Sequence, residues 1–203
     1  MKTVLVLILF FSNMVFAASN ALDKVLAEGD IILQQSQSEQ AAAIAEATDS
    51  VWTHVGIVIK KSGEWHVAEA RGPLQITPIK TFIGRSRNNA YKVMRYGMFT
   101  QKMLPKLYAA LYKYNQPYDI FFEFSDERIY CSELVYKVFR EVTGRPVGLL
   151  QKIKDLKLDG PFVKKLIEER LTAIGRELNP EEPIITPVGL LSDENLTFVH
   201  ESL

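Results

Sequence analysis

The chain opens with a short apolar run and only then changes to alternating patterns. Val4–Phe11 is continuously apolar behind Lys2, and Val15–Ala18 ends in small residues. This order is typical of a secretory signal peptide, and the run is too short to span a bilayer. We therefore predict that residues 1–18 are a removed signal peptide and that residues 19–203 are exported, to the periplasm or beyond the cell.

Period-two patterns typical of β-strands dominate the first half of the mature chain. His54–Ile59 and Trp65–Ala70 have strand character, and Ser62-Gly63 between them is a hairpin signal. Further strands are expected at Ile31–Leu33, Leu74–Pro78, Tyr91–Tyr96 and Asn195–His200.

Helical spacing dominates the second half. The best-defined helix is predicted from Cys131 to Val142, because apolar residues recur there every three or four positions and Thr143–Pro146 is a strong stop. Other helices are expected at Ser36–Thr48, Pro105–Tyr114 and Pro161–Arg170. With no internal repeat or long linker, the pattern predicts one α+β domain, a small and mainly antiparallel sheet packed with helices.

Composition narrows the classes of partner. Lys plus Arg and Asp plus Glu both number 24, so no long-range attraction draws the protein to nucleic acid or to an anionic membrane. No second long apolar stretch follows the first, so no transmembrane segment is expected after processing. A glycine-rich phosphate loop and a His/Cys ligand motif are both missing from the sequence, so we expect neither a cofactor nor a metal.

Cys131 is the single cysteine of the chain. In an oxidising compartment an unpaired thiol is either buried and inert or retained for its reactivity. Cys131 lies three and four residues before Leu134 and Val135, so its side chain points along the inward face of its predicted helix. The first turn of a helix also stabilises a thiolate and can bind an oxyanion. This position favours a reactive nucleophile.

A cysteine nucleophile needs a base, and the chain offers three histidines. His200 lies three residues from the end of the chain and is expected at the surface. His54 and His66 both lie on the predicted hairpin, so its register decides between them.

The turn sets that register. If Ser62-Gly63 forms a two-residue turn, Gly56 lies opposite Glu69, and Glu69 becomes a diagonal neighbour of His54 on the same face. A three-residue turn without a bulge would move Glu69 to the other face and make His66 the better base. The first register predicts a nucleophile, base and orienting carboxylate in Cys131, His54 and Glu69.

Five short motifs follow one another along residues 29–135. They are Gly29-Asp30-Ile31-Ile32, Thr53-His54-Val55-Gly56, Glu69-Ala70, Pro117-Tyr118-Asp119 and Tyr130–Val135. Together they resemble the circularly permuted branch of the NlpC/P60 papain-like superfamily, specifically YiiX-like proteins, in which the histidine precedes the cysteine. The resemblance implies a circularly permuted papain-like fold with Cys131 and His54 as catalytic residues and Glu69 as the third polar residue. It also implies that Tyr130, Tyr118 and Asp119 line the substrate site.

Three functions are compatible with these residues. The leading one is hydrolysis of an amide bond in cell-wall or related small peptides through a Cys131 acyl-enzyme. The second keeps the same Cys-His site but acts on a lipid, as a thioesterase, lipase or acyltransferase, with Tyr118–Phe124 lining an apolar slot. The third is a non-catalytic envelope binding protein that uses the basic run Lys152–Lys157 as a contact surface.

Overall fold

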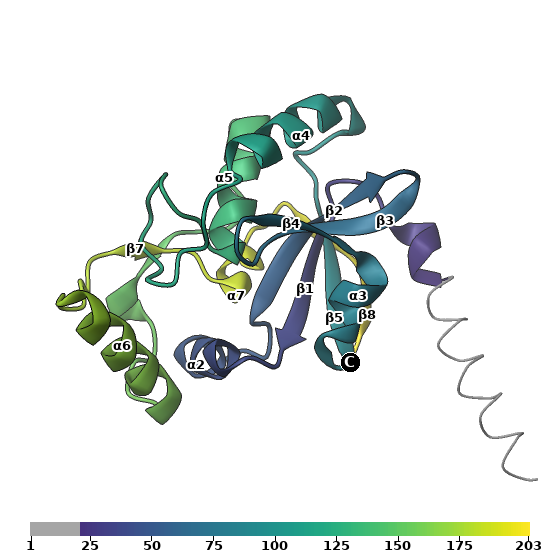
Figure 1. Ribbon diagram of the computed structural model, residues 1–203. Coiled ribbons are helices and arrows are strands. Elements are labelled where there is room, and N and C mark those ends of the chain that lie inside the picture. Colours follow the sequence, from purple (N-terminus) through teal and green to yellow (C-terminus); the bar gives the residue numbers. More distant parts are fainter. Residues whose placement is uncertain (1–20) are drawn as a thin grey trace, which may run out of the picture.

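A six-stranded antiparallel sheet forms the centre of the computed structural model, which describes residues 21–203 (Figure 1). The predicted signal peptide lies outside the described residues. Across the sheet the strand order is β4-β3-β2-β1-β5-β8, and each neighbouring pair is antiparallel. The strands are β1 (Ile31–Ser36), β2 (His54–Lys61), β3 (Glu64–Ala70), β4 (Leu74–Pro78), β5 (Ser86–Tyr96) and β8 (Leu196–Ser202). The predicted antiparallel sheet is confirmed.

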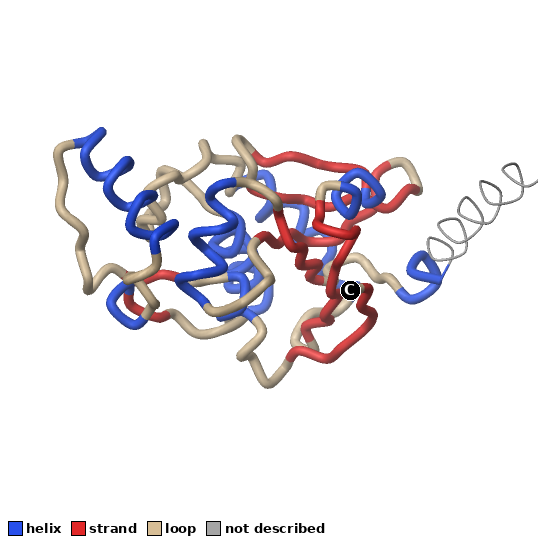
Figure 2. Tube along the Cα trace, turned by 90° about the horizontal axis from the view of Figure 1, so that it is seen from below, coloured by secondary structure: helices blue, strands red, loops and turns tan. Residues whose placement is uncertain are grey.

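Helices cover both faces of this sheet and extend beyond one end of it (Figures 1 and 2). The α-helices are α2 (Glu39–Thr48), α3 (Ile79–Gly84), α4 (Leu104–Lys113), α5 (Cys131–Thr143), α6 (Pro161–Ile174) and α7 (Pro187–Leu190). Two 3-10 turns, η1 (Gln101–Met103) and η2 (Ile153–Asp155), and a two-stranded sheet of β6 (Gln151–Lys152) and β7 (Pro183–Ile184) complete the elements. No helix within residues 21–203 is long and apolar enough to cross a membrane.

The hairpin of β2 and β3 has the two-residue turn. Lys61 pairs with Glu64, and Ser62 and Gly63 between them have φ angles of 53° and 84°. Positive φ at both central residues suits the right-handed twist of a hairpin. Ile57 pairs with Ala68, so one step further along the ladder Gly56 faces Glu69. The register that puts Glu69 on the face of His54 is confirmed.

The two faces of the sheet bury different apolar clusters. On one face, Ile31, Leu33, Val55 and Ile57 pack against α5 through its predicted apolar stripe. On the other, Ile32, Val58 and Val67 pack with Phe82 of α3. The side chains of His54 and Glu69 belong to this second face by strand alternation. Helix α5, which begins at Cys131, contacts the inner strand β2, which begins at His54.

Several boundaries differ from the predictions. The strand predicted from Tyr91 begins at Ser86, where polar residues and the positive φ angles of Asn88 and Asn89 obscure the strand pattern. The helix predicted from Ser36 begins at Glu39, because the Ser38 hydroxyl accepts a hydrogen bond from Ala41 N (3.1 Å) and caps it. Helix α3 was not predicted, since six residues between strands give too short a pattern.

The basic run Lys152–Lys157 is paired with acids. Lys152 and Lys154 both contact Glu181, at 2.7 and 2.5 Å, and Lys157 contacts Asp49 at 2.7 Å. Exposed pairs of this kind contribute little to stability, but they neutralise the run. It therefore gives no support to a basic contact surface.

Candidate active site

Cys131 is the first residue of α5 and is buried, with 2% of its surface exposed. Tyr130 is the N-cap, and its backbone N–H donates to Glu133 Oε2 at 3.3 Å. Burial raises the pKa of Glu133 to about 7, although its ion pair with Lys137 acts in the opposite direction. The backbone amides of the first turn have no partner within the helix, so they are available to stabilise a negative charge beside Cys131.

His54 contacts the other two members of the predicted triad. Its Nε2 lies 2.6 Å from Glu69 Oε2, and Cys131 lies close enough to the ring to raise the pKa of His54. Because Nε2 is taken by the carboxylate, Nδ1 is the ring nitrogen left for the sulfur. Burial disfavours the imidazolium, but the charge and hydrogen bond of Cys131, followed by those of Glu69, raise the pKa of His54 to about 9.

Glu69 is wholly buried and has three partners. Besides His54, Thr77 Oγ1 and Arg85 Nη2 each donate to its Oε1 at 2.5 Å. Burial alone would raise its pKa, but hydrogen bonds and charge from His54, then from Thr77 and Arg85, lower the pKa of Glu69 to about 2. The carboxylate is thus ionised at neutral pH and fixed on both oxygens.

Thr77 and Arg85 were not identified from the sequence. Thr77 pairs with Val67, so by strand alternation it shares the face of Glu69. The short Gly-Pro segment Arg71-Gly72-Pro73 between the two predicted strands is a turn signal, and a hairpin built on it would have identified this neighbour. Arg85 follows the unpredicted helix α3, and no sequence signal indicated that it would reach β3.

The other two histidines lie outside this group. His66 Nδ1 contacts the backbone oxygen of Glu64 at 3.0 Å, and His200 Nδ1 lies 3.1 Å from the Tyr91 hydroxyl. Neither contacts Cys131 or Glu69 in any hydrogen bond or ion pair of the described residues.

A polar cavity of about 530 Å³ reaches His54. Its lining contains two arginines, three glutamines and two serines, and within the described part of the chain no Asp or Glu lines it. The lining residues are Gln34, Ser36, Gln37, Ser38, Gln40, His54, Ala70, Arg71, Arg85 and Tyr118. Chemically this space suits hydrogen-bonding and anionic groups.

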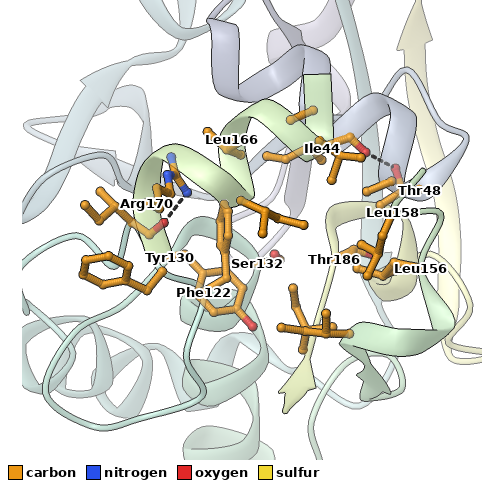
Figure 3. Close-up of a pocket in the computed structure, with 18 of the residues that line it drawn as sticks. Ile44, Thr48, Phe122, Tyr130, Ser132, Leu156, Leu158, Leu166, Arg170 and Thr186 are labelled. Carbon is orange, nitrogen blue, oxygen red and sulfur yellow. Dashed lines mark hydrogen bonds between the residues drawn. The ribbon is translucent and has the colours of Figure 1, made fainter. Parts of the chain in front are cut away.

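A second cavity, of about 110 Å³, reaches Cys131 and is mainly apolar (Figure 3). Its walls come from α2, α6, the loop at residues 120–122, the start of α5 and the segment at residues 184–187. Figure 3 shows Ile44, Leu158 and Leu166 around this space, with Tyr130 and Ser132 at its base near the start of α5. Cys131 lines this cavity but not the polar one, whereas His54 lines the polar cavity but not this one.

The three predicted substrate-binding residues occupy different places. Tyr130 lines the apolar cavity, and its hydroxyl accepts a hydrogen bond from Ile185 N at 3.0 Å. Tyr118 lines the polar cavity; burial, and then the charge of Cys131, raise the pKa of its hydroxyl. Asp119 lines neither cavity. It is buried and accepts a hydrogen bond from Phe121 N at 2.8 Å, so it contacts the backbone of its own loop.

Gln40 joins the polar cavity to helix α6. Its Nε2 donates to the Tyr118 hydroxyl at 2.7 Å, and its Oε1 accepts from Arg170 Nη2 at 2.7 Å. Arg170 also donates to the backbone oxygen of Ile120. These contacts were not predicted, because the three side chains come from α2, α6 and a loop that are far apart in the chain.

Comparisons with known proteins identify the family of the chain. Residues 25–200 match the family model of permuted papain-like amidase enzymes of the YaeF/YiiX type. The chain is 36% identical over 173 residues to the uncharacterized protein YiiX of Escherichia coli K12, covering 84% of each chain.

A solved structure is also similar. It is titled the metalloprotein yiiX from Escherichia coli O157:H7, and it matches with a TM-score of 0.82 and 34% identity over 88% of this chain and 98% of that one. Among the residues described for the present chain, no three His, Cys, Asp or Glu side chains are grouped so that they could hold a metal ion.

The predicted α+β, circularly permuted papain-like fold is confirmed by these matches and by the sheet and its helices. The wider relationship to NlpC/P60 enzymes stays a prediction. A family match over nearly the whole described chain also establishes the type of enzyme, a cysteine hydrolase of the peptidase or amidase kind. The chain belongs to the YaeF/YiiX family of permuted papain-like amidases.

Proposed function

We propose that the protein is an exported cysteine amidase that cleaves small peptides, including cell-wall peptides, with Cys131 as nucleophile, His54 as acid and base, and Glu69 as orienting residue. The observation that carries this proposal is the position of His54, which contacts both Cys131 and the buried Glu69. An imidazolium with a pKa of about 9 is protonated at neutral pH, as the partner of a thiolate must be.

The reaction follows from these positions. The Cys131 thiolate attacks the amide carbonyl carbon, and first-turn amides of α5 stabilise the oxyanion. His54 donates its proton to the amide nitrogen, the C–N bond breaks, and the amine leaves. Water then attacks the thioester while neutral His54 accepts its proton. The C–S bond breaks, releasing a carboxylic acid and restoring the thiolate.

Glu69 acts through His54. Its hydrogen bond to Nε2 fixes the ring so that Nδ1 faces the sulfur, and its charge favours the imidazolium. Thr77 and Arg85 hold the carboxylate in turn, so they are positioning residues.

Hydrolysis of murein peptides and simple acyl amides tests the proposal, with the release of new amino groups as the readout. Cys131→Ala and His54→Ala should lower the rate at least about a thousandfold, the range seen when a member of a catalytic triad is removed. His66→Ala is the matched control, because His66 lies on the same hairpin and its Nδ1 contacts the backbone oxygen of Glu64 and not the proposed triad. Hydrolysis that persists in Cys131→Ala would exclude this mechanism.

The apolar cavity favours a second candidate, in which the same Cys131 takes an acyl chain from a lipid ester or thioester. Cys131 lines this cavity together with aliphatic side chains of α2 and α6, and apolar walls suit a hydrocarbon chain. Intact-mass measurement after incubation with a fatty acyl thioester tests it. An acyl adduct on wild-type protein that is missing from Cys131→Ala supports this candidate, and adducts at other positions contradict it.

A further inference from the structure

We propose that the polar cavity binds a leaving group that carries a free carboxylate, an amino acid or a short peptide, and that Arg71 binds this carboxylate while Gln34 contacts the amine nitrogen. This inference rests on the proposed amidase function and names the class of amine that the enzyme releases.

The two cavities divide the substrate between them. His54 must deliver its proton to the leaving nitrogen, so the amine lies on the side of the site that His54 lines. That side is the polar cavity. The acyl group becomes bonded to Cys131 and lies toward the apolar cavity, which Cys131 lines. The leaving amine is therefore surrounded by polar side chains, whatever the acyl group is.

The charge of the polar cavity favours an anion. Besides the His54 imidazolium, its cations are Arg71 and Arg85, and no carboxylate among the described residues lines it. Arg85 is already bound to Glu69. Arg71 is exposed, follows β3 directly, and has no carboxylate partner within residues 21–203. A guanidinium binds a carboxylate with two parallel hydrogen bonds, which makes Arg71 suited to this group.

Gln34 adds a buried acceptor beside His54. Its residue is only 3% exposed, and its Oε1 has no hydrogen-bond partner among the described residues. Gln34 pairs directly with His54 across β1 and β2, so the two side chains stand side by side on one face of the sheet. A buried acceptor without a partner is costly in a folded protein. An N–H of the substrate nitrogen would satisfy it next to the residue that protonates that nitrogen.

A pair of substrates that differ only in this charge tests the proposal by hydrolysis. N-octanoyl-glycine carries the free carboxylate, and N-octanoyl-glycinamide is its neutral match. We expect a kcat/KM for the carboxylate at least about tenfold higher, and expect Arg71→Gln to remove that preference mainly through KM while Arg71→Lys retains part of it. Arg87→Gln, an exposed arginine of β5 that lines neither cavity, should leave the preference unchanged.

Alkylation of Cys131 tests the anion site without any hydrolysis. Iodoacetate carries a carboxylate and iodoacetamide does not, and both react with the same sulfur. Arg71→Gln should lower the ratio of their rates, iodoacetate over iodoacetamide, by about threefold or more, whereas Gln34→Leu, which changes no charge, should leave the ratio unchanged. Gln34→Leu should instead lower kcat/KM for both octanoyl substrates.

The two experiments separate the possible failures. If no amide is hydrolysed but Arg71 governs the alkylation ratio, the amidase proposal fails and the anion site stands. If both octanoyl substrates are cleaved equally and Arg71→Gln changes neither measurement, the carboxylate site is excluded and the amidase proposal stands.

Discussion

Glu69 Oε2 lies 2.6 Å from His54 Nε2, and the opposite carboxylate oxygen is held by Thr77 and Arg85. The carboxylate therefore cannot turn away from the imidazole without losing hydrogen bonds on both oxygens. Gly56 lies opposite Glu69 on the hairpin and has no side chain, so nothing at this position blocks the diagonal approach of Glu69 to His54. Glu69 therefore fixes the orientation of the proposed base and, together with Cys131, raises its pKa.

The pH dependence of activity should report this pair. The pKa of His54 is about 9, so kcat/KM should fall as pH rises through about 9 and the imidazolium is lost. Glu69→Gln removes a charge and weakens a hydrogen bond that both raise this pKa, so the alkaline limb should move down by roughly one pH unit. Glu64→Gln, an exposed change on the same strand, should leave the limb near 9. An unmoved limb in Glu69→Gln would show that Glu69 does not set the pKa of His54.

Stability should depend on pH through the same two groups. The pKa of Glu69 in the folded protein, about 2, is below its ordinary value of 4.5. Its contribution to the free energy of unfolding is therefore complete above pH 4.5 and is lost as pH falls through about 2. The pKa of His54 in the folded protein is above its ordinary value of 6.5. Its contribution to the free energy of unfolding is therefore complete below pH 6.5 and is lost as pH rises through about 9. The excess unfolding free energy of wild type over Glu69→Gln should be largest between pH 4.5 and 6.5. Urea denaturation at several pH values measures it, and a constant difference would contradict the linkage.

Gly56 should not tolerate a side chain. A Cβ there would lie 2.4 Å from Val67 Cγ1 and 2.8 Å from the backbone oxygen of Ala68, so β3 would have to shift. We expect Gly56→Ala to lower the free energy of unfolding by roughly 2 kcal/mol and to lower activity, because Glu69 lies on the displaced strand. Gly84→Ala is the matched control, since a Cβ at Gly84 meets no atom within 4 Å. Equal urea midpoints for the two variants would refute the close packing of β2 on β3.

The sequence was most informative where the site depends on periodicity. Side chains alternate between the two faces along β2 and β3, and this alternation together with the two-residue turn at Ser62-Gly63 was enough to predict that His54 contacts Glu69. The helical spacing of the apolar residues after Cys131 gave its inward orientation. Both relations involve a repeat of two or of 3.6 residues, so they could be read from one element or one hairpin.

The remaining contacts join elements that are distant in the chain. Arg85 reaches Glu69 from the end of α3, and Gln40 meets Arg170 across 130 positions. The two cavities are also formed by side chains from several elements. Their positions depend on how helices pack around the sheet, and no local pattern specifies that packing. Asp119, which was predicted to bind substrate, shows the same limit, because its carboxylate accepts a hydrogen bond from the backbone of its own loop.

Tyr130 should contribute to stability through its hydroxyl as well as its ring. The residue is 1% exposed, and its oxygen accepts a hydrogen bond from Ile185 N at 3.0 Å, which ties the segment before α7 to the start of α5. Tyr130→Phe leaves that buried N–H without its partner, so we expect a loss of about 1 to 3 kcal/mol in the free energy of unfolding. Tyr112→Phe, at a residue 83% exposed, should change it by less than about 0.5 kcal/mol. Because Ile185 also lines the apolar cavity, the Tyr130 variant should in addition alter KM for substrates with long acyl chains. A Tyr130→Phe protein as stable as the Tyr112→Phe protein would mean that the Ile185 N–H finds another acceptor.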